Sequence, residues 1–154
     1  MNKLRIYIDT SVVGGCFDEE FEEYSNKLMN DFINGKNIVI ISDVLTDELS
    51  KARDEIAKKI KEIPNEYIEI INRNDEIIHL ANAYIENNAI SPKYSDDALH
   101  IASATVVKAS ILVSWNFKHI VNFRRIQLYN AINLMNGYSI IEIRSPREIM
   151  QDEE

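Results

Sequence analysis

The 154-residue sequence contains a single cysteine, Cys16, which excludes an intrachain disulfide and a zinc site built from cysteines. Its three histidines, His79, His100 and His119, lack the spacing of a helical two-histidine metal site. Only four glycines are present, and none forms a Gly-rich phosphate loop after a strand or a Gly-x-Ser-x-Gly nucleophile elbow. Nucleotide-binding and serine-hydrolase functions are therefore poorly supported.

Positive charge is also scarce, because 17 Lys and Arg face 25 Asp and Glu, for a formal net charge of −8. A general nucleic-acid coat is excluded, since it needs clustered cations that neutralise phosphates. A nuclease is not excluded, because acids gathered at a metal site add to the negative count and bound cations reverse the local field. The sequence has no apolar run of membrane-spanning length and no signal peptide, so we expect a soluble, cytoplasmic protein without a membrane partner.

The sequence does contain a regular alternation of short apolar strands and amphipathic helices. This alternation predicts an α/β fold with a largely parallel, five-stranded sheet and helices on both faces. We expect one domain over residues 1–146, followed by a polar, acidic tail over 147–154. Strands are expected at 4–8, 37–41, 67–71, 111–114 and 139–143, and helices from 17 to about 34 and at 45–63, 75–88, 96–108 and 117–136. The pair Gly14-Gly15 is expected to break the pattern between the first strand and the first helix. Ser95 is expected to cap the helix over 96–108.

The stretch from Ile6 to Val12 combines a buried strand with an acid and two hydroxyls at its end. An open parallel sheet binds ligands outside the carboxyl ends of its strands, which is where Asp9 is expected. The alternative is that Asp9, Thr10 and Ser11 only cap the following helix.

Further acids are expected at the same edge of the sheet. Glu48 lies in the helix after the second strand, Asp96 and Asp97 open the helix before the fourth, and Ser114 to Asn116 follow that strand. A cluster of carboxylates repels itself unless a cation holds it, and oxygen ligands suit Mg²⁺ or Mn²⁺. Such ions activate water and stabilise charge in phosphodiester cleavage.

Each of these residues also has a structural explanation. Glu48 can be a solvated helical acid, and Asp96 and Asp97 suit the positive start of a helix. Asn116 can favour a turn, and Trp115 can pack in the core or at its rim. His100 and His119 can be hydrogen-bonded structural residues.

The combined pattern resembles the PIN domain, a nuclease family that includes the VapC-type toxins of toxin–antitoxin operons. The resemblance rests on Ile8-Asp9-Thr10-Ser11, Asp47-Glu48-Leu49, the run from Ser95 to Ala104, and Leu112 to Phe117. It covers nearly the whole chain. The family implies a three-layer α/β/α architecture with strand order 3-2-1-4-5.

Carried over residue by residue, the resemblance implies that Asp9, Glu48 and Asp97 are metal ligands for Mg²⁺ or Mn²⁺. Ser114 matches the hydroxyl of the family's Thr/Ser-x-Asp motif, whereas Asn116 stands where many members carry an acid. The site therefore has one negative charge fewer, although the Asn116 carbonyl oxygen could still orient a metal-bound water. Asp96 is a candidate to compensate as a further ligand.

The leading hypothesis is a divalent-metal-dependent endoribonuclease, with Asp9, Glu48, Asp97, Ser114 and Asn116 as its catalytic residues. The resemblance implies products with 5′-phosphate and 3′-hydroxyl ends, and a role as the toxin of a type II toxin–antitoxin pair. Candidate RNA phosphate contacts are Lys118, His119, Arg124 and Arg125, which can equally form a solvated helix face.

Two kinds of protein contact are also expected. The family implies an antitoxin partner, and often a homodimer for which the helices at 45–63 and 75–88 are candidate interfaces. The alternative function is a PIN-fold protein with weak or no nuclease activity that acts through protein–protein contacts. The residue Asn116, the acidic composition and the lack of a broad basic stripe favour this alternative.

Overall fold

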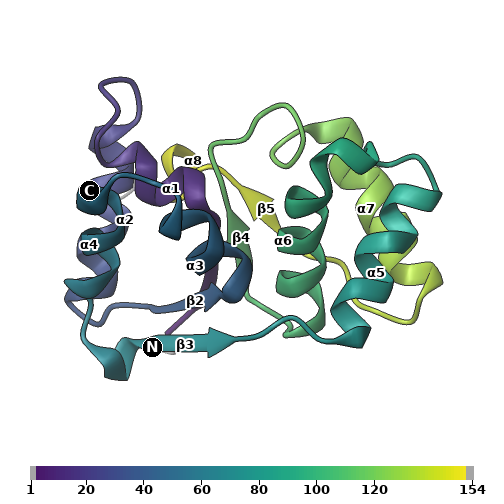
Figure 1. Cartoon of the computed structure of the whole chain (residues 1–154), viewed down its shortest axis with the longest axis horizontal. Coiled ribbons are helices and arrows are strands. Elements are labelled where there is room, and N and C mark those ends of the chain that lie inside the picture. The colour runs from purple at the N-terminus through teal and green to yellow at the C-terminus, as the bar shows by residue number, and fades with distance from the viewer. Residues whose placement is uncertain (1–2, 152–154) are drawn as a thin grey trace.

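The computed structural model describes residues 3–151 of the chain. Its sheet has the order β3-β2-β1-β4-β5, with every neighbouring pair of strands parallel (Figure 1). The predicted α/β class, strand number and strand order are confirmed. The strands are β1 (Arg5–Ile8), β2 (Ile38–Ser42), β3 (Ile68–Ile71), β4 (Ile111–Val113) and β5 (Ile143–Arg144). The helices are α1 (Thr10–Gly15), α2 (Glu22–Ile33), α3 (Asp43–Ser50), α4 (Asp54–Lys61), α5 (Asp75–Glu86), α6 (Ser95–Val106), α7 (Phe123–Met135) and α8 (Pro146–Met150).

Helices cover both faces of the sheet, which produces the three layers seen in Figure 1. Successive side chains of a strand point to opposite faces, so each strand contributes to two cores. Tyr7, Ile40 and Leu112 pack with residues of α5, α6 and α7. On the other face, Ile8 and Val113 pack with residues of α1, α2 and α8. Within residues 3–151, no helix has the length and apolarity to cross a membrane.

Polar residues begin where the central strands end. Asp9 follows β1 and is the N-cap residue of α1, but its side chain makes no cap hydrogen bond. Ser42 ends β2 and caps α3, with its hydroxyl oxygen accepting the Leu45 N–H at 3.3 Å. Ser114 follows β4 and is fully buried. The carboxyl ends of these parallel strands therefore bring polar side chains to one edge of the sheet.

The glycine pair does not have its expected role. Gly14 and Gly15 complete α1, and the next helix begins only at Glu22. A Cβ atom on Gly15 would lie 2.5 Å from Ser25 Oγ and 2.8 Å from Trp115 Nε1. Gly15 is therefore needed for the close packing of α1. The prediction that the glycine pair breaks the pattern before the first helix is wrong.

Two other helix boundaries differ from the prediction. The expected helix over 45–63 is divided into α3 and α4, because residues 51–53 leave the helical path. Ser95 was expected to cap the helix before β4 but is its first residue, and Tyr94 takes the N-cap position without a side-chain hydrogen bond. Both differences are local and leave the order of the elements unchanged.

The C-terminal part is more ordered than the expected tail. Residues 147–150 belong to α8, whose start has a capping box between Ser145 and Glu148. Met150 is buried in the core beside α2. The expectation of a tail from residue 147 is therefore wrong for these residues, and 152–154 lie outside the described part.

Two other C-terminal elements are shorter than expected. The helix expected from 117 starts at Phe123, because Asn122 caps it through the N–H of Arg125. The fifth strand is reduced to Ile143–Arg144. The first difference leaves residues 114–122 as an irregular segment beside the polar edge.

Candidate functional site

Asp9 is the most enclosed acid at the polar edge of the sheet, with 4% of its surface exposed. Its two carboxylate oxygens each accept a serine hydroxyl, Oδ1 from Ser11 and Oδ2 from Ser114, both at 2.6 Å. Burial raises the pKa of Asp9, and the charge of Glu48 acts in the same direction, whereas the charge of His100 and the two serine hydrogen bonds oppose the rise. The carboxylate is therefore fixed in orientation, and its pKa stays raised despite these partners.

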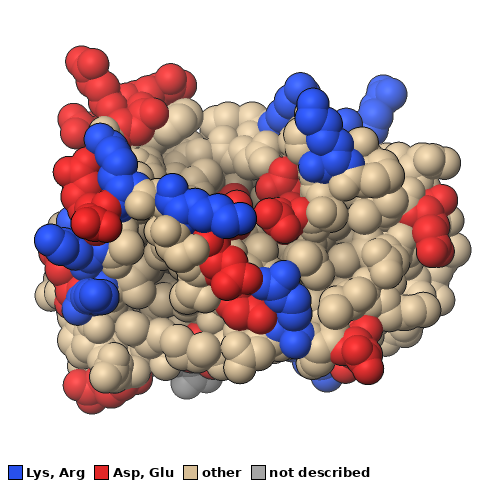
Figure 2. All heavy atoms as spheres, viewed as in Figure 1, with Lys and Arg blue, Asp and Glu red and all other residues tan. Residues whose placement is uncertain are grey.

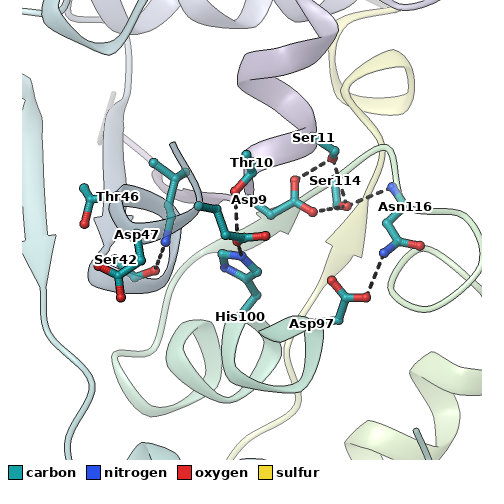
Figure 3. A network of polar contacts seen from close by, with 12 residues as sticks. Asp9, Thr10, Ser11, Ser42, Thr46, Asp47, Asp97, His100, Ser114 and Asn116 are labelled. Atoms are coloured by element: carbon teal, nitrogen blue, oxygen red, sulfur yellow. Dashed lines mark hydrogen bonds and ion pairs between the residues drawn. The ribbon is translucent and has the colours of Figure 1, made fainter. Parts of the chain in front are cut away.

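Asn116 forms a second contact from the segment after β4. Its Oδ1 accepts the backbone N–H groups of Lys118 at 3.2 Å and His119 at 2.9 Å. These two donors fix the amide orientation, so Nδ2 donates to Oδ2 of Asp97 at 3.1 Å. The Asn116 carbonyl oxygen is thus engaged by the backbone, and an N–H group faces the acid instead. Asn116 acts here by orienting Asp97, as Figure 3 shows.

Asp97 lies in the first turn of α6 and is only half-buried. Its pKa is raised to about 6, mainly by burial and further by the charges of Asp9 and Glu48. The positive charge of His100 and the hydrogen bond from Asn116 oppose this rise. The raising effects are the larger ones, so the ionised form of Asp97 is disfavoured. A solvated acid at the start of a helix would not show this rise.

Glu48 has the opposite electrostatic situation. Its Oε1 accepts the Thr10 hydroxyl at 2.9 Å and Nε2–H of His100 at 2.6 Å. Burial alone would raise the pKa of Glu48, but the hydrogen bond and charge of His100 and the hydrogen bond from Thr10 lower it. Glu48 is therefore held ionised, and its second oxygen, Oε2, remains available.

His100 stands at the centre of the site and is 1% exposed. Its Nδ1 shares a hydrogen bond of 2.7 Å with the Tyr7 hydroxyl, which lies 2.8 Å from Ser42 Oγ. Burial disfavours the imidazolium, but the hydrogen bond with Glu48 and the charges of Asp9, Glu48 and Asp97 raise the pKa of His100. One imidazole thus experiences three carboxylates at once.

The chemistry of these donors fits an oxygen-preferring divalent cation such as Mg²⁺ or Mn²⁺, because the charge of Glu48 raises the pKa of Asp9, and the charges of Asp9 and Glu48 raise the pKa of Asp97. Among residues 3–151, however, no three His, Cys, Asp or Glu side chains form a ready-made set of metal ligands. The site therefore has the right donors, held by hydrogen bonds to protein groups.

The remaining candidates differ in their placement. Asp96 is exposed on α6, and adjacent helical residues point about 100° apart, so it does not share the position of Asp97. Lys118 and Arg124 are exposed. His119 is buried with its ring centroid 3.8 Å from that of Tyr94, and Arg125 donates to the Ala89 carbonyl at 2.7 Å. Of the four expected phosphate contacts, two face solvent and two contribute to packing.

Sequence reasoning missed much of the support around the acids. Thr10, Ser11 and His100 contact the carboxylates directly. Tyr7 holds the imidazole, and Ser42 in turn contacts the Tyr7 hydroxyl. A helical signal for His100 existed, because it follows Asp97 by three residues and therefore shares its face of α6. Tyr7 also had a signal, because side chains two residues apart in a strand point to the same face, which predicts Tyr7 on the side of Asp9.

Comparisons with known proteins support the fold alone. No family model and no curated protein matches the chain. Among solved structures, the chain is similar to one chain of VapBC2 from Rickettsia felis, a structure bound to a DNA fragment from the VapBC2 promoter. The TM-score is 0.59 and the sequence identity 18%, and the match covers 92% of this chain and 98% of that one. Tyrosyl-tRNA synthetase from Aeropyrum pernix is similar with a TM-score of 0.50 and 10% identity, over 92% of this chain and 52% of that one. Together with the observed strand order, the first likeness identifies a VapC-like PIN fold.

Proposed function

We propose that the chain is a divalent-metal-dependent endoribonuclease that hydrolyses RNA phosphodiester bonds. The observation that carries this proposal is a chain of hydrogen bonds at one edge of the sheet, in which Ser114 binds Asp9 and Asn116 joins Ser114 to Asp97 (Figure 3). Glu48 reaches the same edge through its hydrogen bond with the buried imidazole of His100. These acids come from three separate elements, and their mutual repulsion is the condition that a divalent cation relieves.

Bound Mg²⁺ or Mn²⁺ would lower the pKa of an attacking water and stabilise charge on the leaving oxygen. The chain's own residues prepare the ligands. Ser11 and Ser114 fix the Asp9 carboxylate, and Thr10 and His100 hold Oε1 of Glu48 so that Oε2 is left for an ion.

Asn116 orients Asp97 through one carboxylate oxygen and leaves the other available. In this proposal Ser114 and Asn116 are positioning residues, and Asp9, Glu48 and Asp97 are the metal ligands. Asp96 takes no part in the proposed ligand set, because it is exposed and points away from Asp97.

The test is cleavage of a mixed panel of single-stranded RNAs by the purified chain, with Mn²⁺ added or chelated. We expect metal-dependent cleavage that Asp97→Asn abolishes and the neighbouring substitution Asp96→Asn leaves intact. Cleavage that persists in EDTA, or is unchanged in Asp97→Asn, would contradict the proposal. Products with 5′-phosphate and 3′-hydroxyl ends are expected.

The RNA strand is proposed to contact the exposed cations beside the acids. Lys118 and Arg124 lie beyond β4, and Figure 2 shows Lys and Arg side chains over the connection from β4 to α7. His119 and Arg125 are engaged in packing and in a backbone hydrogen bond, so we assign phosphate contacts only to Lys118 and Arg124.

A toxin role in a type II toxin–antitoxin pair, acting in the cytoplasm, is part of the same proposal. One similar solved structure is a VapBC2 assembly, which motivates an antitoxin partner for this chain. The homodimer is proposed from the resemblance to the PIN family. An apolar groove of about 270 Å³ between α3 and α4 is lined by Leu49, Ala57 and Ile60 and offers a surface for such contacts. Size-exclusion chromatography with light scattering would test the dimer.

The second candidate function is a PIN-fold protein that acts through protein contacts with little nuclease activity. The observation in its favour is the Asn116 amide, which directs an N–H group toward Asp97 and so opposes a bound cation. Saturable Mn²⁺ binding that requires Asp97 would contradict this candidate, whereas a thermal melt unchanged by millimolar Mn²⁺ would support it.

A further inference from the structure

A second feature adjoins the acids on the side of α1 and α2. It is a hollow of about 150 Å³ lined by Phe21, Tyr24, Trp115 and Phe117, with Glu20 and Arg147 at its rim. The rings of Phe21 and Trp115 are stacked, with centroids 4.3 Å apart and planes inclined by 22°. Phe117 meets Trp115 edge-on at 6.1 Å and is itself 50% exposed. The hollow thus presents aromatic walls to solvent.

The wall of this hollow is held rigidly from behind. The Trp115 indole N–H donates to Ser25 Oγ at 2.7 Å, and the Ser25 hydroxyl donates to the Val12 carbonyl at 2.8 Å. Gly15 leaves room for this contact, because a Cβ there would approach Trp115 Nε1 to 2.8 Å. A preformed aromatic wall binds a ring with little loss of side-chain entropy.

The same segment joins the hollow to the acids. The Trp115 backbone N–H donates to Ser11 Oγ at 2.9 Å, and Ser11 in turn binds Asp9. Asn116, which orients Asp97, lies between Trp115 and Phe117 in the chain. A group seated in the hollow would therefore adjoin a group held at the three carboxylates.

Size and chemistry restrict what the hollow can take. Pockets for drug-sized ligands span about 300–1,000 Å³, so 150 Å³ suits one ring system and not a whole nucleotide. Unpaired nucleobases stack on aromatic side chains regardless of sequence. Glu20 offers an acceptor and Arg147 a donor for the edge of a base.

The distribution of charge favours a base over a phosphate in the hollow. Asp18, Glu19 and Glu20 are exposed in the connection between α1 and α2, and Figure 2 shows acids gathered there. The rim carries Glu20 beside Arg147, so it has no excess of positive charge that would attract a phosphate. A neutral base suits the hollow better, and the exposed Lys118 and Arg124, which follow Phe117 in the chain, remain for the phosphates.

We propose that this hollow is a base-binding subsite, which takes one unpaired base of a single-stranded RNA whose adjoining phosphate lies at the cation that Asp9, Glu48 and Asp97 are proposed to hold. This inference rests on the proposed ribonuclease function and extends it to substrate class, namely RNA with an unstacked base next to the cleaved bond. Phe117 is the residue that the base contacts most directly, since it is the most exposed wall.

The test measures binding in EDTA, so that it is independent of cleavage. The probes are 2′-O-methyl RNA octamers of A, C or U, with matched octamers that contain abasic positions. Trp115 is the only tryptophan, so its fluorescence reports occupation of the hollow, and anisotropy of labelled octamers reports affinity. We expect Phe117→Ala to weaken binding roughly tenfold, which is within the range for the stacking of one base.

Phe123→Ala is the matched control, because Phe123 is an 80% exposed aromatic residue outside the hollow. We expect it to change affinity by less than about twofold, and we expect the salt dependence to be the same in both variants because the phosphate contacts are untouched. Equal binding of the intact and abasic octamers, or equal effects of the two substitutions, would overturn the proposal. Quenching of Trp115 by a basic peptide but by no octamer would also overturn it and assign the hollow to a protein segment.

Metal-dependent cleavage is assayed in parallel, so that the base-binding subsite and the proposed ribonuclease activity are tested separately. If cleavage occurs without a contribution of Phe117 to binding, the subsite is wrong and the nuclease stands. If octamers bind through Phe117 but neither cleavage nor Mn²⁺ binding occurs, the subsite stands and the ribonuclease proposal fails.

Discussion

Two parts of the same site, one around Glu48 and one around Asp97, give their carboxylates different hydrogen-bond partners and opposite pKa shifts. Glu48 receives two hydrogen bonds on one oxygen, from Thr10 and from His100, and its pKa is lowered. Asp97 receives one hydrogen bond, from the neutral amide of Asn116, and its pKa is raised to about 6. The protein therefore supplies its own positive charge to Glu48 and only a neutral donor to Asp97, which is where the proposed cation would be needed.

The largest expected effect concerns the half that lacks charge. In the proposed ribonuclease, Asp97→Asn removes a metal ligand and should lower metal-dependent cleavage at least about 100-fold, as loss of a group that stabilises transition-state charge does. Asp96→Asn is the matched control, since it removes the neighbouring exposed acid, and should leave the rate within about twofold. The rates are compared with a labelled RNA at saturating Mn²⁺, and similar losses in both variants would contradict the assignment.

Substitutions in the half of the site that contains Glu48 and His100 should mainly change the stability of the fold. His100→Ala leaves the Tyr7 hydroxyl and Glu48 without their buried partner, and we expect it to lower the free energy of unfolding by about 2–4 kcal/mol. His79→Ala, at an exposed position of α5, should change it by less than about 0.5 kcal/mol. Urea denaturation measures both values, and a near-neutral His100→Ala would show that the network contributes little to folding.

Asn116→Asp should sharpen the contrast between the halves. It replaces the N–H group that faces Asp97 with an oxygen, so Mn²⁺ affinity should rise about tenfold, the lower end of what a supporting residue of a metal site contributes. Without metal the same change places two acids together and should lower the melting temperature. Calorimetric titration and thermal melts with and without Mn²⁺ test this, and unchanged Mn²⁺ affinity would contradict the role given to Asn116.

The smallest expected effect is a pH dependence of the metal-free protein. The pKa of Asp97 is about 6 in the folded chain against an ordinary value of 3.8, so the folded state binds more protons between these values. Stability contributed by this group therefore falls as pH rises from about 4 to about 6 and stays level above. The difference in unfolding free energy between wild type and Asp97→Asn isolates the contribution of Asp97 protonation. We expect this contribution to be about 1 kcal/mol, because Asp97 is half-exposed and solvent screens its charge. A flat difference across this range would show that the pKa of Asp97 is not raised in the folded chain.

The fold could be predicted from the sequence because its signals are local and repeated. Short β-branched runs alternate with amphipathic stretches, and parallel strands place their carboxyl ends at one edge. The failures were also local. Gly15 indicated a break because the close approach of Trp115 and Ser25 is not visible in sequence. Met150 looked like part of a polar tail because its burial depends on packing beside α2.

The candidate site was predictable only in part. Asp9, Glu48 and Asp97 were named from position and resemblance. The structure links Asp9 to Asp97 through Ser114 and Asn116, and Glu48 to His100. His100, Thr10 and Ser11 were not assigned to the site, because a hydrogen bond across elements depends on side-chain geometry that spacing does not give. Asn116 was expected to offer a carbonyl oxygen, but the backbone N–H groups after it engage that oxygen.

The most direct test of the account is a calorimetric titration of the metal-free protein with Mn²⁺ at neutral pH, alongside Asp97→Asn and Asp96→Asn. The account predicts saturable binding to wild type and to Asp96→Asn, and its loss in Asp97→Asn, because only Asp97 shares the site with Asp9 and Glu48. No saturable binding to the wild type, or binding that Asp97→Asn leaves unchanged, would contradict the claim that these three carboxylates form a cation site.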